Sequence, residues 1–235
     1  MTLPFLLSVP HAGLKVPSEV KDICRLDQQD IIEDGDSGAA EIYLPLERHV
    51  AAMVSTPIAR AIVDMNRSED DRRKDGVVKS HTCWNVPVYK RPPTEKMIGT
   101  LLEKYHRPYH QNIFRHSRGI YLGIDCHTMA EIGPSVGPDS GLKRPRICLS
   151  NGDGTCPQSW IESFARCFSD VFRTDVSINH PFKGGHIIRS HAQEIPWIQI
   201  ELSREGFLSL EEKSVCLLEA LMAWFEKGYI AERDL

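Results

Sequence analysis

Three apolar runs, rich in Ile, Leu and Val, each end on a residue that can hold a metal or move a proton. The runs are FLLSVP before His11, GIYLGIDC before His127 and WIQI before Glu201. Runs of this length and composition are typical of buried strands. In open α/β sheets the chemistry lies in the crevice beyond the carboxyl ends of such strands. The two imidazoles and the carboxylate are therefore expected to converge, and they predict a catalytic zinc centre.

Strands alternate with helices along the chain. Strands are predicted over 4–10, 58–65, 119–126, 146–150 and 197–202, with one more after the turn at 180–185. Helices are predicted over 37–53 (with a kink at Pro45), 95–117, 157–172 and 211–227. This alternation predicts a three-layer α/β fold. A chain of 235 residues without a repeat or a linker fits one domain over 1–235.

The composition excludes several classes of protein. The formal net charge of −4 gives no electrostatic reason to expect nucleic acid or an anionic membrane as a partner. No apolar stretch approaches the roughly 20 residues that span a bilayer. The N-terminus lacks a basic region and a small-residue cleavage site, so it is interpreted as a first strand. Seven cysteines without a C-x-x-C pair argue against a zinc ribbon or a disulfide framework, and the cytoplasm is the expected compartment.

The second histidine is supported by a neighbouring carboxylate. Asp125 lies two residues before His127, so on a strand both side chains share a face, as in the usual carboxylate–histidine–metal arrangement. A third ligand is still needed. Candidates are the carboxylates clustered where the first helix begins, namely Asp34, Asp36 and Glu41. For Asp36 the alternative is plain N-capping of that helix.

Glu201 is the strongest candidate for a general base. It shares a strand face with Gln199 and Trp197. A carboxylate inside a central strand is costly unless it is paired or functional. The alternative is a buried salt bridge, for instance to Arg189 or Arg204.

His106 and His110 have the i, i+4 spacing by which a helix presents two metal ligands. Pro108 interrupts that helix, so a structural or substrate-facing role is favoured over ligation. Arg67 and Arg189 are candidates for binding carboxylates, because a guanidinium matches a carboxylate in a bidentate way. Each is equally consistent with a surface or packing arginine. The Gly- and Pro-rich stretch 133–145 is interpreted as a surface or lid loop.

Seven motifs occur in one order along the chain. They are SVPHAG (8–13), DGDSGAAEIY (34–43), IVDMNR (62–67), YHRPYH (105–110), DCHTM (125–129), NHPFKGGHIIR (179–189) and QIELSR (199–204). Together they resemble the N-formylglutamate amidohydrolase family over about residues 6–207, a relative of the zinc carboxypeptidases and aspartoacylases. The resemblance implies a zinc-carboxypeptidase-like (phosphorylase/hydrolase-like) αβα sandwich, with a mixed, mostly parallel sheet of about eight strands.

The resemblance also implies roles for the site residues. It suggests His11, Asp36 and His127 as ligands of one Zn2+ per chain, with Glu201 as general base. In the carboxypeptidase pattern the carboxylate ligand lies three residues after the first histidine, a position held here by Leu14. The carboxylate must therefore come from elsewhere, and the family comparison points to Asp36.

The implied substrate is a small, acidic N-acyl amino acid such as N-formyl-L-glutamate, hydrolysed to formate and glutamate. Asn66 and Arg67 resemble the Asn-Arg pair that grips a substrate carboxylate in the relatives, and Arg189 is the expected second cation. One alternative is a related metallohydrolase acting on another N-acyl amino acid or a small peptide. Another is a non-catalytic binding protein on the same fold. A serine hydrolase is disfavoured because the chain has no G-x-S-x-G elbow.

Overall fold

The computed structural model describes residues 2–134, 139–152 and 154–231 and contains one mixed sheet. Its strands are β1 (Leu3–Val9), β2 (Val50–Ser55), β3 (Leu122–Met129), β4 (Ile147–Ser150), β5 (Val176–Ile178) and β6 (Trp197–Ser203). Their order across the sheet is β2-β1-β3-β6-β4-β5, and the β4–β6 pair alone is antiparallel among these strand pairs. The mixed, mostly parallel sheet is confirmed, although the described residues form six strands rather than about eight.

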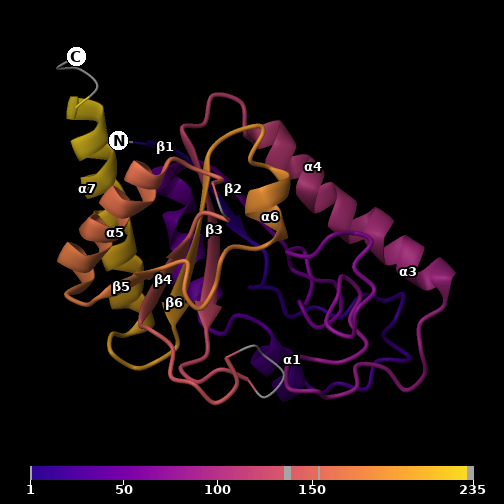
Figure 1. The fold of residues 1–235 in the computed structure, drawn as a ribbon. Helices are drawn as coiled ribbons and strands as arrows, with labels where there is room; N and C mark the ends of the chain where they lie inside the picture. The colour runs from indigo at the N-terminus through magenta and orange to yellow at the C-terminus, as the bar shows by residue number, and fades with distance from the viewer. Residues whose placement is uncertain (1, 135–138, 153, 232–235) are drawn as a thin grey trace.

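Helices cover both faces of the sheet, which confirms the three-layer arrangement. On one side lie α2 (Ala39–Tyr43), α5 (Gln158–Phe172) and α7 (Leu210–Ala231). Figure 1 shows α5 and α7 across the sheet from α4 (Arg107–His116) and α6 (His186–Ser190). The remaining helices are α1 (Gln28–Asp34), α3 (Glu95–Leu101), the 3-10 segment η1 (Leu44–His49) and the π segment η2 (Leu102–His106). None of the described helices has the length and apolar character to cross a bilayer.

The two faces of the central strands differ, and this difference positions the site. One face of β3 and β6 packs into the core with α5 and α7 through Leu122, Ile124, Cys126, Ile198, Ile200 and Leu202. The other face begins with Trp197 lying over Gly123, where a Cβ at position 123 would be 2.4 Å from the indole. Toward the carboxyl ends of the strands the same face becomes polar. A buried polar surface at this edge must be hydrogen-bonded or functional.

The second strand was predicted in the wrong place. Residues 58–65 form turns and irregular structure, joined to the rest by an isolated bridge between Lys15 and Ile58. The strand beside β1 is instead β2, which begins at Val50, so the helix predicted over 37–53 is wrong from that residue onward. Pro45 lies at the start of η1, where the regular helix gives way to a 3-10 turn. Proline cannot donate the next helical hydrogen bond, so the chain leaves the helix early and pairs with β1.

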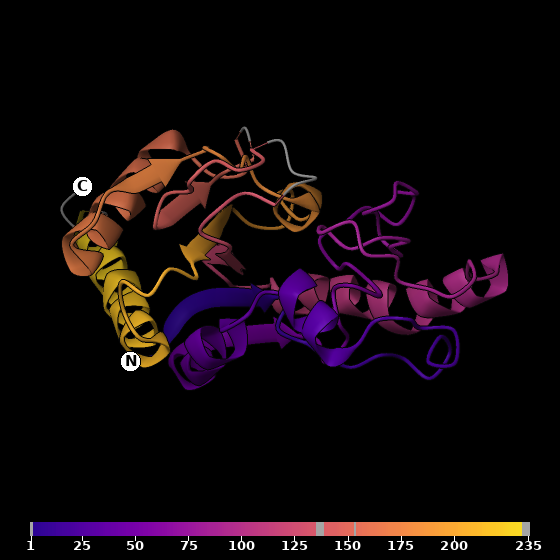
Figure 2. The ribbon, with the colours of Figure 1, turned by 90° about the horizontal axis from the view of Figure 1, so that it is seen from below.

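The helix predicted over 95–117 is confirmed as a continuous α3–η2–α4 rod, which Figure 2 shows running away from the sheet. The π segment lies directly before the turn that contains Pro108. Proline removes one i→i−4 bond and crowds the preceding turn, and a π-bulge is one way to accommodate it. The turn at 180–185 leads into α6, so the strand predicted there is wrong. Residues 135–138 of the expected lid lie outside the described residues.

Candidate active site

The site lies at the sheet edge where β1, β3 and β6 end. His11 lies just beyond the end of β1, and His127 and Glu201 occupy directly paired positions on β3 and β6. Asp36 comes from the short segment between α1 and α2, and its N–H donates to the carbonyl of His11 at 3.2 Å. All four side chains are buried. The structure therefore brings together the four residues that the sequence singled out.

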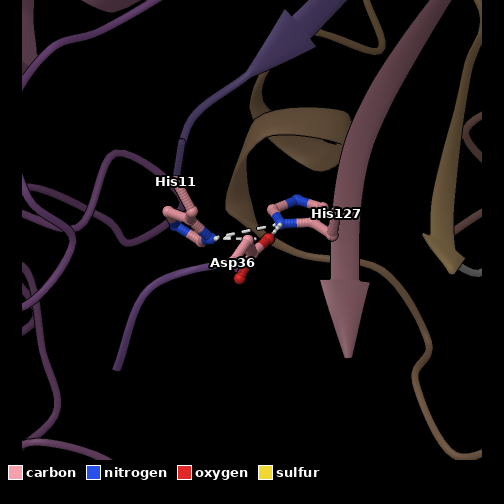
Figure 3. A group of neighbouring side chains, drawn as sticks. All are labelled: His11, Asp36 and His127. Atoms are coloured by element: carbon pink, nitrogen blue, oxygen red, sulfur yellow. Dashed lines mark hydrogen bonds and ion pairs between the residues drawn. The ribbon is translucent and has the colours of Figure 1, made fainter. Parts of the chain in front are cut away.

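Three electron-pair donors face one another at this edge. The Nδ1 atoms of His11 and His127 are 3.1 Å apart. Asp36 Oδ2 lies 3.0 Å from Nδ1 of His127 and 3.5 Å from Nδ1 of His11. Figure 3 shows the two rings and the carboxylate pointing toward one another. Among the described residues, this is the group of His, Cys, Asp or Glu side chains whose geometry could hold a metal ion.

The far nitrogen of each ring fixes its tautomer. His11 Nε2 lies 2.8 Å from Asp64 Oδ1, and His127 Nε2 lies 2.8 Å from Asp125 Oδ2. A carboxylate accepts, so each Nε2 carries the hydrogen and each Nδ1 presents its lone pair to the centre. Two lone pairs and an anionic oxygen at these separations repel one another unless a cation lies between them. This donor set fits a divalent transition metal.

The charges at the centre support the same conclusion. Burial alone would raise the pKa of Asp36, but the imidazoles of His11 and His127 hold that pKa well below its usual range. Burial would lower the pKa of His127, whereas the charge of Asp125 raises it well above the ordinary value. The centre thus binds positive charge strongly, and a metal would compete with protons for the same electron pairs.

The other candidates for the third ligand are engaged elsewhere. Asp34 is buried in a pair with Lys79, with Oδ2 2.9 Å from Nζ, and Glu41 is exposed. Capping does not account for Asp36, because α2 has Gly38 at its N-cap and no side-chain cap bond. Asp36 Oδ2 instead accepts from the backbone N–H of Thr128 on β3 at 3.1 Å.

Glu201 is held by one neutral partner. Gln199 Nε2 donates to Glu201 Oε1 at 2.9 Å, and the backbone N–H of Gly185 donates to Gln199 Oε1 at 2.7 Å. The second bond fixes which end of the Gln199 amide faces the carboxylate. Burial raises the pKa of Glu201. Within the described residues no ion pair involves Glu201, so neither Arg189 nor Arg204 forms the alternative salt bridge.

A cavity of about 240 Å³ opens over these residues, and Asn66 and Arg67 also line it. The Asn66 amide donates to Asp125 Oδ2 at 3.1 Å, and its Oδ1 accepts from the N–H of Ile187 at 2.8 Å. Arg67 Nη2 binds Asp75 at 3.1 Å, while its buried Nε has no hydrogen-bond partner among the described residues.

Arg189, the expected second cation, is not among the described residues that line the cavity. Its Nη2 donates to the carbonyl of Lys183 at 3.0 Å. Lys183 itself does line the cavity, and its side chain forms no ion pair or hydrogen bond with the described residues. Lys183 was overlooked in the sequence because an exposed lysine carries no periodic or positional signal.

Asp64, the partner of His11, was also overlooked. It is buried and lies 3.1 Å from Nε of Arg60. Burial alone would raise its pKa, but His11 and Arg60 keep that pKa well below its usual range. A signal was present, because Asp64 lies between the apolar run AIV (61–63) and Met65. The reasoning applied to Glu201, that a carboxylate among apolar residues needs a partner or a function, identifies it equally well.

The fold and the site together define an α/β protein with a buried His–Asp–His cluster that could hold a metal ion. A family model described as N-formylglutamate amidohydrolase matches residues 3–208. The chain belongs to this family.

Individual relatives agree with that assignment. The N-formylglutamate deformylase of Pseudomonas putida is 25% identical over 97% of this chain and 95% of its own length. That of Pseudomonas aeruginosa is also 25% identical, over 97% of this chain and 96% of its own length. The crystal structure of N-formylglutamate amidohydrolase from Ralstonia eutropha JMP134 has the same fold, with a TM-score of 0.78, 20% identity and coverage of 97% and 95% of the two chains.

Proposed function

We propose that this chain is a zinc-dependent amidohydrolase that cleaves the formyl amide of N-formyl-L-glutamate to formate and glutamate. The observation that carries the proposal is the convergence of two imidazole nitrogens and a carboxylate beside Glu201, at the floor of a cavity. The relatives named N-formylglutamate deformylase support the choice of substrate.

His11 and His127 would hold the metal through Nδ1, and Asp36 through Oδ2. Nitrogen and carboxylate donors from two histidines and one acid form a common catalytic zinc set. Zinc bound there supplies Lewis acidity, which polarises a carbonyl and lowers the pKa of water. Asp64 and Asp125 keep the two rings in the tautomer that this role requires.

Glu201 moves the proton. It takes a proton from the water that attacks the formyl carbon, and it returns that proton to the amide nitrogen as the C–N bond breaks. Its raised pKa favours both transfers near neutral pH, since a carboxylate of ordinary acidity is a poor proton donor there. Because Gln199 occupies Oε1, the other carboxylate oxygen is the one that receives the proton.

Two cations bind the two carboxylates of the substrate. Arg67 offers a buried Nε that forms no hydrogen bond with the described residues and lies 3.9 Å from Asp64 Oδ2, and a guanidinium suits a carboxylate. We assign the second carboxylate to Lys183, which lines the cavity, in place of Arg189. The amide of Asn66 is bound to Asp125 and to the N–H of Ile187, and these bonds fix the position of the residue beside Arg67.

The test is hydrolysis by the purified, zinc-loaded protein. N-formyl-L-glutamate is compared with N-acetyl-L-glutamate, N-formyl-L-methionine and a dipeptide, and each released acid and amine is quantified. Formate and glutamate released with the highest kcat/KM of the panel support the proposal. Preferred release of another product identifies a related metallohydrolase instead. No hydrolysis, together with a metal content well below one per chain, identifies a binding protein.

A further inference from the structure

The segment from Asp64 to Arg67 carries three side chains of the site but belongs to no helix or strand. Asp64 binds His11, Asn66 binds Asp125, and Arg67 lines the cavity. Without a neighbouring strand or a helical turn, its backbone carbonyls must find other partners, because buried peptide groups are costly when unpaired. Those partners determine where the three side chains stand.

Two histidines of the α3–η2–α4 rod supply the missing donors. His110 Nε2 lies 3.0 Å from the carbonyl oxygen of Met65, and His106 Nε2 lies 2.9 Å from that of Arg67. A carbonyl only accepts, so both rings carry hydrogen on Nε2. The two bonds hold the peptide unit before Asn66 and the peptide unit after Arg67.

Burial keeps both rings neutral. It lowers the pKa of His110 to about 2, with the neighbouring His106 and His191 adding to the effect, and it also lowers the pKa of His106. Because Nε2 of His110 carries its hydrogen, Nδ1 is an acceptor, and Nε2 of His191 lies 2.9 Å from it. The ring of His110 is therefore held at both nitrogens and cannot rotate freely.

The side chain of Asn66 also contacts the turn at Gly185. A Cβ at Gly185 would lie 2.2 Å from Asn66 Nδ2, so the turn and the amide are in close contact. The N–H of Gly185 orients Gln199, and Gln199 donates to Glu201. A displaced Asn66 would disturb Arg67 beside it and this turn opposite it.

We propose that His106 and His110 are positioning residues of the hydrolase site. They hold the peptide unit before Asn66 and the one after Arg67, and through them they set the place of Arg67 at the cavity. They lie outside the three residues that could hold the metal. The consequence for substrate binding rests on the proposed function, whereas the positioning itself does not.

Paired substitutions distinguish the effect of losing the N–H donor from the effect of losing the volume of the imidazole ring. His110→Gln and His106→Gln retain an N–H near the position of Nε2, and His110→Leu and His106→Leu do not. Each Leu variant should raise KM for N-formyl-L-glutamate by about 2- to 12-fold, the range that one neutral hydrogen bond is worth. The Gln variants should recover most of this loss, with kcat changed less than KM and zinc content unchanged. His116→Leu, at an exposed site on α4, is the matched control.

A second measurement does not depend on turnover. Amide hydrogen exchange at Asn66 and Ile187, followed by NMR, should be faster in the Leu variants and near the wild-type rate in the Gln variants. Unchanged exchange in His106→Leu and His110→Leu, or Gln variants as impaired as the Leu variants, would overturn the inference. If the wild-type protein hydrolyses no N-formyl amino acid, the proposed function fails, and the exchange data still decide the positioning role.

Discussion

Replacing Glu201 with Gln removes the proposed proton carrier while changing little else. The amide oxygen of glutamine can still accept the 2.9 Å bond from Gln199 Nε2. Among the described residues Glu201 has no ion pair to lose, and its raised pKa shows that burial already disfavours the charge. The free energy of unfolding of Glu201→Gln should therefore be close to that of the wild type. General acid–base catalysis contributes about 10²–10⁴-fold, so kcat should fall by that factor, or by about 3–5 kcal/mol in the barrier.

The assay follows formate and glutamate release, with zinc measured on the same samples by mass spectrometry. Glu201→Gln should keep its zinc, because the proposed ligands are His11, Asp36 and His127. Glu205→Gln is the control, since Glu205 lies outside the cavity lining and pairs with Arg146 at 3.4 Å. The reasoning fails if the Glu201 variant, fully loaded with zinc, keeps more than about a tenth of the wild-type kcat.

Three further outcomes are expected. Asp125→Asn should weaken zinc affinity by about 10–100-fold, measured by competition with a chelating dye, because the ring it orients loses its carboxylate. Lys183→Met should raise KM for N-formyl-L-glutamate but not for N-formyl-L-glutamine, whereas Arg189→Met should change neither, as steady-state kinetics will show. Burial lowers the pKa of His110 from the ordinary 6.5 to about 2, so below pH 6.5 the unfolded chain binds a proton that the folded chain does not. Stability should fall as the pH decreases from 6.5, by up to about 1.4 kcal/mol per pH unit from this group. Urea unfolding of His110→Gln between pH 7 and 5 should show a shallower dependence.

The sequence predicted correctly the strands whose position follows from a local run of apolar residues. The apolar runs before His11 and around Asp125 and Glu201 form adjacent strands because their Ile, Leu and Val side chains favour burial. The paired positions of His127 and Glu201 follow from two neighbouring parallel strands. Asp36 could be named only through the family resemblance, since three carboxylates cluster in that region of the sequence.

The remaining features depend on tertiary contacts that leave no local pattern. Residues 58–65 have a strand-like composition, but β2 already occupies the place beside β1, so the segment becomes a loop held by imidazoles. The segment HIIRS is apolar enough for a strand and forms α6 after the Gly184–Gly185 turn. The place of Arg189 outside the cavity lining follows from that change, because a short helix directs its side chain differently from a strand.

The antiparallel direction of β4 determines which part of the chain lines one side of the cavity. Ile147 at the start of β4 pairs with Leu202 near the end of β6, so β4 begins at the edge where β3 finishes. The chain between β3 and β4 thus leaves and re-enters the sheet at the same edge, with Ile132 bridged to Lys143 and Arg144 lining the cavity. Insertions or deletions in that connection can reshape the wall of the cavity without moving the strands that carry His127 and Glu201. Substrate preference can therefore diverge within the family while the hydrolytic centre stays fixed.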